Sequence, residues 1–264
     1  MAEESVAVDK TGNGTVATVR INRPQVLNAL NADLLRRLGD ELDALNVDRR
    51  TRAIVLTGTG EKAFSAGADL DELATLDATS AHDAMRSGQA VIRGIEKSRV
   101  PVIAAVNGLA LGGGFELVLA CSFAVVSRRA AFGLPESGLG LIPGYGGTQR
   151  LARIVGPAVA RHVTLTGSRI DAERAYQLGL AVGTPSEPEQ LLPTALQIAE
   201  AIAGKGPRAC RAILEAVDRG LDMPLDAGLA LETGLAALAI GGDESSEGVA
   251  AFKEKRAPKF EDPS

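Results

Sequence analysis

The sequence predicts an α/β fold, and three observations in its 264 residues lead to that class. The chain begins with strand, helix and strand patterns in succession. A unit of strand, glycine-rich loop and helix then recurs. From about residue 187 the pattern changes to successive helices. The sequence therefore predicts an α/β core over residues 1–186 and a helical region over residues 187–264.

The first predicted elements are a β-hairpin, a helix and a buried strand. Val6–Val8 and Thr15–Ile21 have strand composition and are separated by Gly12-Asn13-Gly14. Asn31 is a plausible N-cap for a helix with an apolar face. A short apolar strand follows at 53–57. The face of the helix consists of Leu34, Leu35, Leu38, Leu42 and Leu45.

The next predicted elements repeat the order of strand, glycine loop and helix. An amphipathic helix at 80–98 leads to a strand at 102–106 and then to the sequence GGGFEL. A further strand covers Ser122–Ser127. The segment from Gly138 to Gly147 is too rich in glycine to be regular, and a helix begins near Gly147.

Four helices are predicted in the last part of the chain. They cover 187–203, 207–219, 224–239 and 243–255, with Pro207 and Pro224 near helix starts. The run at 228–240 is apolar on nearly all sides, which is more than a peripheral helix needs. We therefore expect another subunit to cover it.

Three consecutive glycines, Gly112 to Gly114, precede an apolar run in which Glu116 carries the one charge. Glycines let a ligand approach backbone N–H groups, and a helix start aims unpaired N–H groups at the same space. The segment thus predicts an oxyanion site. A carboxylate buried there costs several kcal/mol unless it is paired or protonated. Glu116 is accordingly either a catalytic group, a partner in a buried salt bridge or a helix N-terminal carboxylate that interacts with the dipole.

A second isolated carboxylate, Glu136, lies in the stretch AFGLPESGLGLIPGYGGTQRL. The next charge along the chain is Arg150. Two lone acids in apolar surroundings are typical of an acid/base pair.

The motifs GGGFEL, AFGLPESGLGLIPGYGGTQRL and AFSAGADL, in this order and spacing, resemble those of the enoyl-CoA hydratase (crotonase) family. The similarity extends from INRPQVLNALN to EGVAAFKEKRAPKF. It implies a crotonase-like spiral of ββα units with a C-terminal helical region for trimerisation. It also implies hydration of trans-2-enoyl-CoA to 3-hydroxyacyl-CoA in fatty-acid or related acyl-CoA degradation, with coenzyme A as part of the substrate and no separate cofactor.

The resemblance also assigns site residues. The backbone N–H groups of Ala68 and Gly113 match the oxyanion hole, Glu116 matches the group that activates water, and Glu136 matches the proton donor to Cα. The substrate and its CoA would be contacted by Val26, Ala66, Asp69, Leu70, Phe252 and Lys255. Phe252 and Lys255 would act on the CoA of a neighbouring subunit, in a homotrimer or a dimer of trimers.

Composition excludes several other classes. The net charge of −5 argues against a general nucleic-acid surface. The two cysteines, Cys121 and Cys210, and the two histidines, His82 and His162, form no metal-ligand pattern, so no metal site is predicted. The start MAEESVAVDK has no signal character and no apolar run has the length of a membrane helix, so a cytoplasmic protein without membrane contact is expected.

Three alternatives remain open. Residues 58–63, GTGEKA, match a dinucleotide-binding fingerprint, although FSAGAD follows where a helix should begin. Another acyl-CoA enzyme of the same fold is possible, such as an isomerase, decarboxylase or hydrolase, but these commonly lack one of the two glutamates. A hydratase for a methyl-branched substrate such as methylglutaconyl-CoA is also possible. The third alternative is a non-catalytic scaffold that contacts RNA.

Two positions depart from the family pattern. Ser122 stands where an Asp commonly follows the Cys, which is predicted to alter how the loop carrying Glu136 is held. Leu134 replaces a frequent polar residue and is predicted to make the pocket more apolar.

Overall fold

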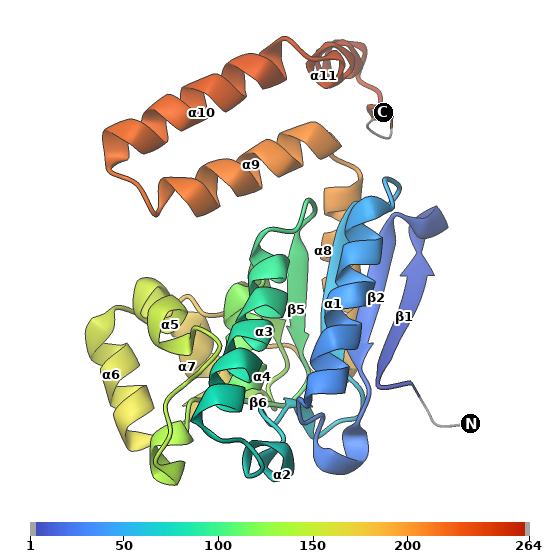
Figure 1. Ribbon diagram of the computed structural model, residues 1–264. Coiled ribbons are helices and arrows are strands. Elements are labelled where there is room, and N and C mark those ends of the chain that lie inside the picture. The colour runs from blue at the N-terminus through green and yellow to red at the C-terminus, as the bar shows by residue number, and fades with distance from the viewer. Residues whose placement is uncertain (1–3, 262–264) are drawn as a thin grey trace.

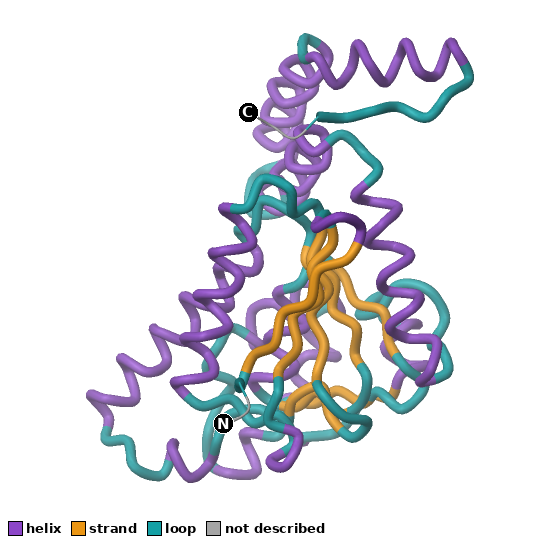
Figure 2. The backbone as a smooth tube through the Cα atoms, turned by 90° about the vertical axis from the view of Figure 1, so that its right-hand side faces the viewer, coloured by secondary structure: helices purple, strands orange, loops and turns teal. Residues whose placement is uncertain are grey.

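The computed structural model describes residues 4–261, which form two β-sheets flanked by helices (Figures 1 and 2). The larger sheet has the strand order β1-β2-β3-β5-β7, and the smaller has the order β4-β6-β8-β9. The pairs β1/β2 and β8/β9 are antiparallel, and the other neighbouring strands are parallel. The larger sheet consists of β1 (Val6–Thr11), β2 (Val16–Ile21), β3 (Ala53–Gly58), β5 (Val102–Val106) and β7 (Phe123–Val126). The smaller sheet consists of β4 (Ala63–Ser65), β6 (Leu109–Leu111), β8 (Ala131–Gly133) and β9 (Ile170–Asp171).

Three consecutive ββα units connect the two sheets. Each unit contributes its first strand to the larger sheet and its second to the smaller: β3-β4-α3, then β5-β6-α4, then β7-β8-α5. The predicted spiral of ββα units is therefore confirmed. Sequence analysis did not find the smaller sheet, because none of its strands exceeds 3 residues and periodicity has no room to develop.

The helices follow the predicted pattern with some shifts and additions. Those of the core are α1 (Ala32–Val47), α2 (Leu70–Leu73), α3 (Ala78–Glu96), α4 (Gly113–Ala120), α5 (Gly147–Val155), α6 (Pro157–Thr166), α7 (Ala172–Gln177) and α8 (Pro188–Ala203). Short 3-10 turns occur at η1 (Gly12–Gly14), η2 (Pro24–Val26) and η3 (Glu136–Leu139). The start of α3 differs from the predicted residue 80, since a capping box between Asp77 and Ser80 begins the helix two residues earlier.

The central strands β3 and β5 of the larger sheet are buried on both faces. Ile54 and Leu56 of β3 belong to one apolar cluster, with the helices α1, α3 and α4, while Ala53 and Val55 belong to a second cluster, with α8. This explains why these strands are continuous apolar runs rather than alternating ones. The predicted apolar face of α1 is buried as expected, and the Asn31 side chain accepts the Leu34 N–H.

The C-terminal helices divide into one that covers the sheet and three that do not. Leu191, Ala195 and Ala199 of α8 are buried against the sheet, so α8 is part of the core although it lies beyond the predicted boundary at residue 187. The helices α9 (Pro207–Gly220), α10 (Leu225–Ile240) and α11 (Asp243–Glu254) project from one end of the core, where α9 and α10 lie side by side (Figure 1). In α10 no residue is buried within the single chain.

The dinucleotide-binding interpretation of residues 58–63 is wrong, because β3 is followed by β4 and not by the helix that would hold a pyrophosphate.

Among residues 4–261 no single helix has the length and apolar character to cross a membrane. The helices α10 and α11 have that length and character only when they are taken together, and a bend of 67° separates them.

Candidate active site

The backbone at Gly112 places Glu116 in the first turn of a buried helix. Gly112 is the N-cap of α4 with φ of 49° and ψ of −126°, a conformation that favours glycine. All eight residues of α4 are buried, and Glu116 is 1% exposed. The predicted position of Glu116 in the first helical turn is confirmed.

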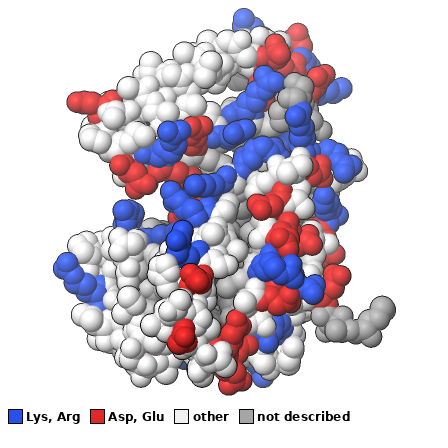
Figure 3. Space-filling model, viewed as in Figure 1, with Lys and Arg blue, Asp and Glu red and all other residues white. Residues whose placement is uncertain are grey.

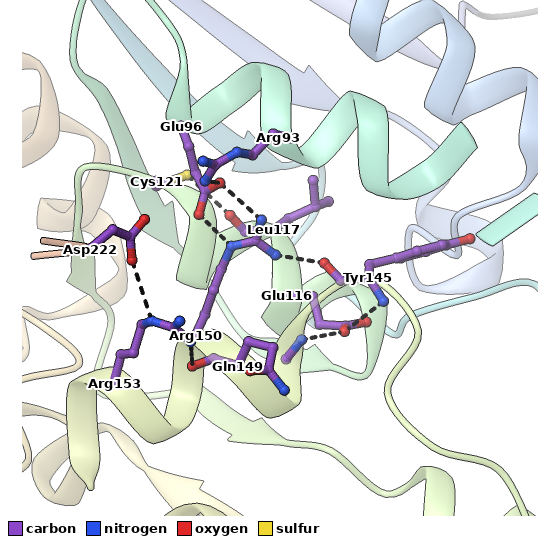
Figure 4. Close-up of polar contacts among 11 residues, drawn as sticks. Arg93, Glu96, Glu116, Leu117, Cys121, Tyr145, Gln149, Arg150, Arg153 and Asp222 are labelled. Atoms are coloured by element: carbon purple, nitrogen blue, oxygen red, sulfur yellow. Dashed lines mark hydrogen bonds and ion pairs between the residues drawn. The ribbon is translucent and has the colours of Figure 1, made fainter. Parts of the chain in front are cut away.

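The Glu116 carboxylate is held by backbone donors. The Tyr145 N–H donates to Oε1 at 2.8 Å and the Gly147 N–H donates to the same oxygen at 2.7 Å (Figure 4). Glu116 has no ion pair within residues 4–261, so the structure does not support a buried salt bridge. Because both donors bind Oε1, the second oxygen remains available to a water or a substrate.

Burial raises the pKa of Glu116 to about 7. Desolvation is the largest cause, the Gly147 N–H opposes it, and the charge of Glu136 adds to the increase. Leu134 contributes to the apolar surroundings, since it is fully buried and lies beside Gly147 together with Glu116. A carboxylate with a pKa near neutral pH is suited to accept and return a proton.

This raised pKa predicts that Glu116 destabilises the protein at alkaline pH. The folded protein retains a proton that the unfolded chain loses, so the free energy of unfolding should fall as pH rises from about 4.5 to about 7. Glu116→Gln keeps an acceptor for the Tyr145 and Gly147 N–H groups and removes this fall in the free energy of unfolding, because glutamine does not ionise. We expect the variant to be more stable than wild type by about 2–3 kcal/mol at pH 8 and by little at pH 4.5, in urea denaturation at both values. The control is Glu187→Gln on the surface; a wild type and Glu116→Gln that differ equally at both pH values would contradict the prediction.

Glu136 lies next to Gly112, the N-cap of the helix that carries Glu116. It begins η3, directly after Pro135, and a Cβ atom built on Gly112 would lie 3.0 Å from its Oε1. Its Oε2 atom is buried and has no hydrogen-bond partner. Desolvation raises the pKa of Glu136, and its own backbone N–H opposes this. The structure thus brings together the two carboxylates that sequence analysis selected.

Two unpaired N–H groups lie close together, one in the loop after β4 and the other at the first residue of α4. The Gly67–Ala68 segment follows β4, and a Cβ atom on Gly67 would lie 3.3 Å from the Gly113 nitrogen. Gly67 has a φ of 97°, a backbone conformation that would be strained for a residue with a side chain. Within residues 4–261 neither the Ala68 N–H nor the Gly113 N–H donates a hydrogen bond, so both remain available as donors.

The residues predicted to contact CoA fall into two groups. Val26, Ala66, Asp69 and Leu70 lie near the Gly67–Ala68 segment: the Ala66 N–H donates to the Leu27 carbonyl, and Asp69 accepts from Arg23 at 3.0 Å. The side chains of Val26 and Leu70 are exposed. Phe252 and Lys255 belong to the end of α11, which lies at the opposite end of the molecule from α2 (Figure 1). The chain does not bring this second group to its own site.

Sequence analysis missed the groups that hold Glu116. The Tyr145 and Gly147 N–H groups come from the glycine-rich segment before α5, which was predicted as irregular without a role. The signal was the repeated glycine in PGYGGTQR, since a loop that binds a carboxylate through its backbone needs close approach. Ser122 accepts a hydrogen bond from the Val102 N–H at 3.2 Å, and its predicted effect on the Glu136 loop stays a prediction.

A metal-binding cluster is not found among the described residues: no three His, Cys, Asp or Glu side chains group to hold an ion.

Comparison with known proteins shows which family this chain is similar to. Residues 11–263 match the family model described as enoyl-CoA hydratase/isomerase. The chain is 41% identical to the crotonyl-CoA hydratase of Syntrophomonas wolfei, over 98% of this chain and 99% of that protein. It is 40% identical to the short-chain-enoyl-CoA hydratase of Clostridium acetobutylicum, over 97% of both. A crystal structure of enoyl-CoA hydratase from Bacillus anthracis superimposes with a TM-score of 0.94 at 39% identity, covering 98% of this chain and all of that one. The chain belongs to the enoyl-CoA hydratase/isomerase family.

Proposed function

We propose that this protein is an enoyl-CoA hydratase, which adds water reversibly to a trans-2-enoyl-CoA to give a 3-hydroxyacyl-CoA. The observation that carries the proposal is the pairing of two isolated carboxylic groups, both with raised pKa, beside two unpaired backbone N–H groups. Hydration needs both an acid and a base, whereas related reactions on this fold commonly use one glutamate.

The mechanism assigns a role to each group. Glu116 accepts a proton from water as the water oxygen forms a bond to C3 of the substrate. The π electrons of the double bond move to C2 and the thioester oxygen, where the Ala68 and Gly113 N–H groups stabilise the enolate. Each oxyanion donor can be worth about 3 kcal/mol by analogy with other oxyanion holes. Glu136, whose pKa is raised by desolvation, then delivers a proton to C2.

A hydration assay with crotonyl-CoA tests the function directly, since two relatives carry the names crotonyl-CoA hydratase and short-chain-enoyl-CoA hydratase. We expect the absorbance of the conjugated thioester to fall, and the product to carry ¹⁸O at C3 when the reaction is run in H₂¹⁸O. A panel of longer and branched enoyl-CoA esters then defines the chain-length preference. Loss of conjugation without ¹⁸O would indicate an isomerase, and no change with any ester would refute an enzymatic function.

We also propose that the protein assembles as a trimer or a dimer of trimers. The proposal is supported by α10, which exposes Leu225, Leu229, Leu238 and Ile240 and shows a largely uncharged surface (Figure 3). Exposed apolar surface of this kind usually marks an interface. Phe252 of α11 is 85% exposed in the single chain, which leaves it free to contact a neighbour.

Assembly and the shared site can be tested with two variants. Truncation after Gly242 removes α11 and is expected to give smaller species in sedimentation velocity. Lys255→Ala is expected to leave assembly intact and to raise KM for CoA thioesters, less so at high salt, because the lysine would act on a phosphate near the surface. A wild type that sediments as an active monomer, or an unchanged KM for Lys255→Ala at low salt, contradicts the shared site.

A further inference from the structure

Arg150 is a largely buried cation next to the site, and the hydration mechanism gives it no role. Its side chain is 15% exposed and projects from α5. The guanidinium binds Glu96 of α3 with two hydrogen bonds, from Nε to Oε1 at 2.5 Å and from Nη2 to Oε2 at 3.0 Å (Figure 4). Its remaining terminal nitrogen, Nη1, donates to the Tyr145 carbonyl at 2.6 Å. All three nitrogens of the guanidinium are therefore engaged.

The contact with Tyr145 connects Arg150 to the catalytic carboxylate. The N–H of Tyr145 donates to Glu116, and the carbonyl of Tyr145 accepts from Arg150. Both backbone polar groups of Tyr145 are therefore hydrogen-bonded. Gly147, the second donor to Glu116, is the first residue of the helix that carries Arg150. Chain flexibility in this glycine-rich turn would otherwise allow both donors to move.

We propose that Arg150, held by Glu96, is a positioning residue that fixes the 145–147 turn and so the Glu116 carboxylate. The proposal rests on the proposed function for the role of Glu116. Arginine suits this task because its planar donors can bind a carboxylate in two places and a carbonyl at the same time. A lysine would keep the charge but could not make all three hydrogen bonds.

Glu96 gives the arrangement its rigidity. Its side chain is 19% exposed and also accepts from Arg93 at 2.5 Å. Largely buried ion pairs add little net stability, but loss of one partner leaves the other uncompensated. Removing the Glu96 charge should therefore free the guanidinium of Arg150 from α3 without removing its charge.

The charged groups around Glu116 allow the proposal to be tested in the pH dependence of kcat. Arg150 lowers the pKa of Glu116 and Glu136 raises it, while burial keeps the nearby Tyr145 hydroxyl neutral by raising its pKa to about 12. Glu96 is faced in turn by Arg93 and by Asp218 of α9. Loss of the Arg150 charge should consequently move the acidic limb of the kcat profile to higher pH.

The test compares Arg150→Met, Arg150→Lys and Glu96→Gln with Arg153→Met. Arg153 lies one helical turn further along α5, is 62% exposed, and makes a loose ion pair with Asp222 at 3.8 Å, so it matches Arg150 in charge and helix but not in contacts. The kcat and KM for crotonyl-CoA are measured from pH 5 to 9. The pKa of Glu116 is measured without substrate by ¹³C NMR of the carboxyl groups, with Glu116→Gln used to assign the signal.

We expect Arg150→Met to lower kcat about tenfold or more with KM changed by less than about threefold, as loss of a catalytic group's orientation does. Its acidic limb and its Glu116 pKa should both move to higher pH. Arg150→Lys should lower kcat while its limb stays near that of wild type. Glu96→Gln should lower kcat without moving the limb upward, and Arg153→Met should match wild type throughout.

An Arg150→Met protein with the kcat and pH limb of Arg153→Met overturns the proposal. If Arg150→Met does not fold, Arg150→Lys and Glu96→Gln decide, and wild-type kcat in both overturns it. A wild type that hydrates no enoyl-CoA refutes the proposed function alone, because the NMR titration still reports whether Arg150 controls the Glu116 carboxyl group.

Discussion

Glu116→Gln and Glu136→Gln are each expected to lower kcat at least about a hundredfold, because removal of a positioned acid or base typically costs 10²–10⁴. Glutamine retains the size and an acceptor oxygen, so the Tyr145 and Gly147 N–H groups keep their partner in the Glu116 variant. Affinity for the CoA ester should therefore change little. The measurement is steady-state hydration of crotonyl-CoA together with binding of a non-hydratable acyl-CoA.

The structure supplies a control for these two variants. Glu187 is 66% exposed and pairs with Arg128 on the surface, so Glu187→Gln should retain the activity of wild type. The two active-site variants are expected to fold normally. Turnover within threefold of wild type in either would exclude a mechanism in which both carboxyl groups move protons.

Gly113→Pro is expected to reduce kcat by a factor of about 10²–10³ or to abolish it, because it deletes one of the two proposed oxyanion donors. Gly113 is the first residue of α4, a position where proline is well tolerated and where the N–H has no partner within residues 4–261. The helix itself should therefore form. Circular dichroism and thermal unfolding check the fold, and hydration of crotonyl-CoA checks the activity.

Gly113→Ala is the matched control. A Cβ atom there would lie 3.1 Å from the Tyr145 ring and 3.2 Å from Leu30, so both variants crowd the same neighbours, but alanine keeps the N–H. The difference between the two variants isolates the hydrogen bond. If both lose activity equally, crowding explains the loss and Gly113 has no demonstrated place in the oxyanion hole.

Elements with a long or distinctive pattern were predictable. The leucine face of α1 follows from helical periodicity, because the helix is long enough for burial to impose a regular spacing. The strands β3 and β5 follow from short continuous apolar runs, and the helices from residue 188 onward follow from apolar segments divided by glycine and proline. The smaller sheet was not predictable, since its short strands exist only where consecutive units stack in space. The place of α8 in the core was equally hidden: small apolar residues on one face do not say what they pack against.

For the site, the sequence by itself determined which groups are the candidates for the chemistry. Glu116 and Glu136 stood out because a lone carboxylate in an apolar run is costly, and Gly113 stood out because consecutive glycines expose backbone N–H groups. Tertiary structure alone decided how these groups are held. The donors to Glu116 are backbone atoms 29 and 31 residues away, and Arg150 reaches Glu96 across 54 residues. Backbone N–H groups are the same in every residue except proline, so no side-chain pattern reveals which of them the fold will direct at a carboxylate.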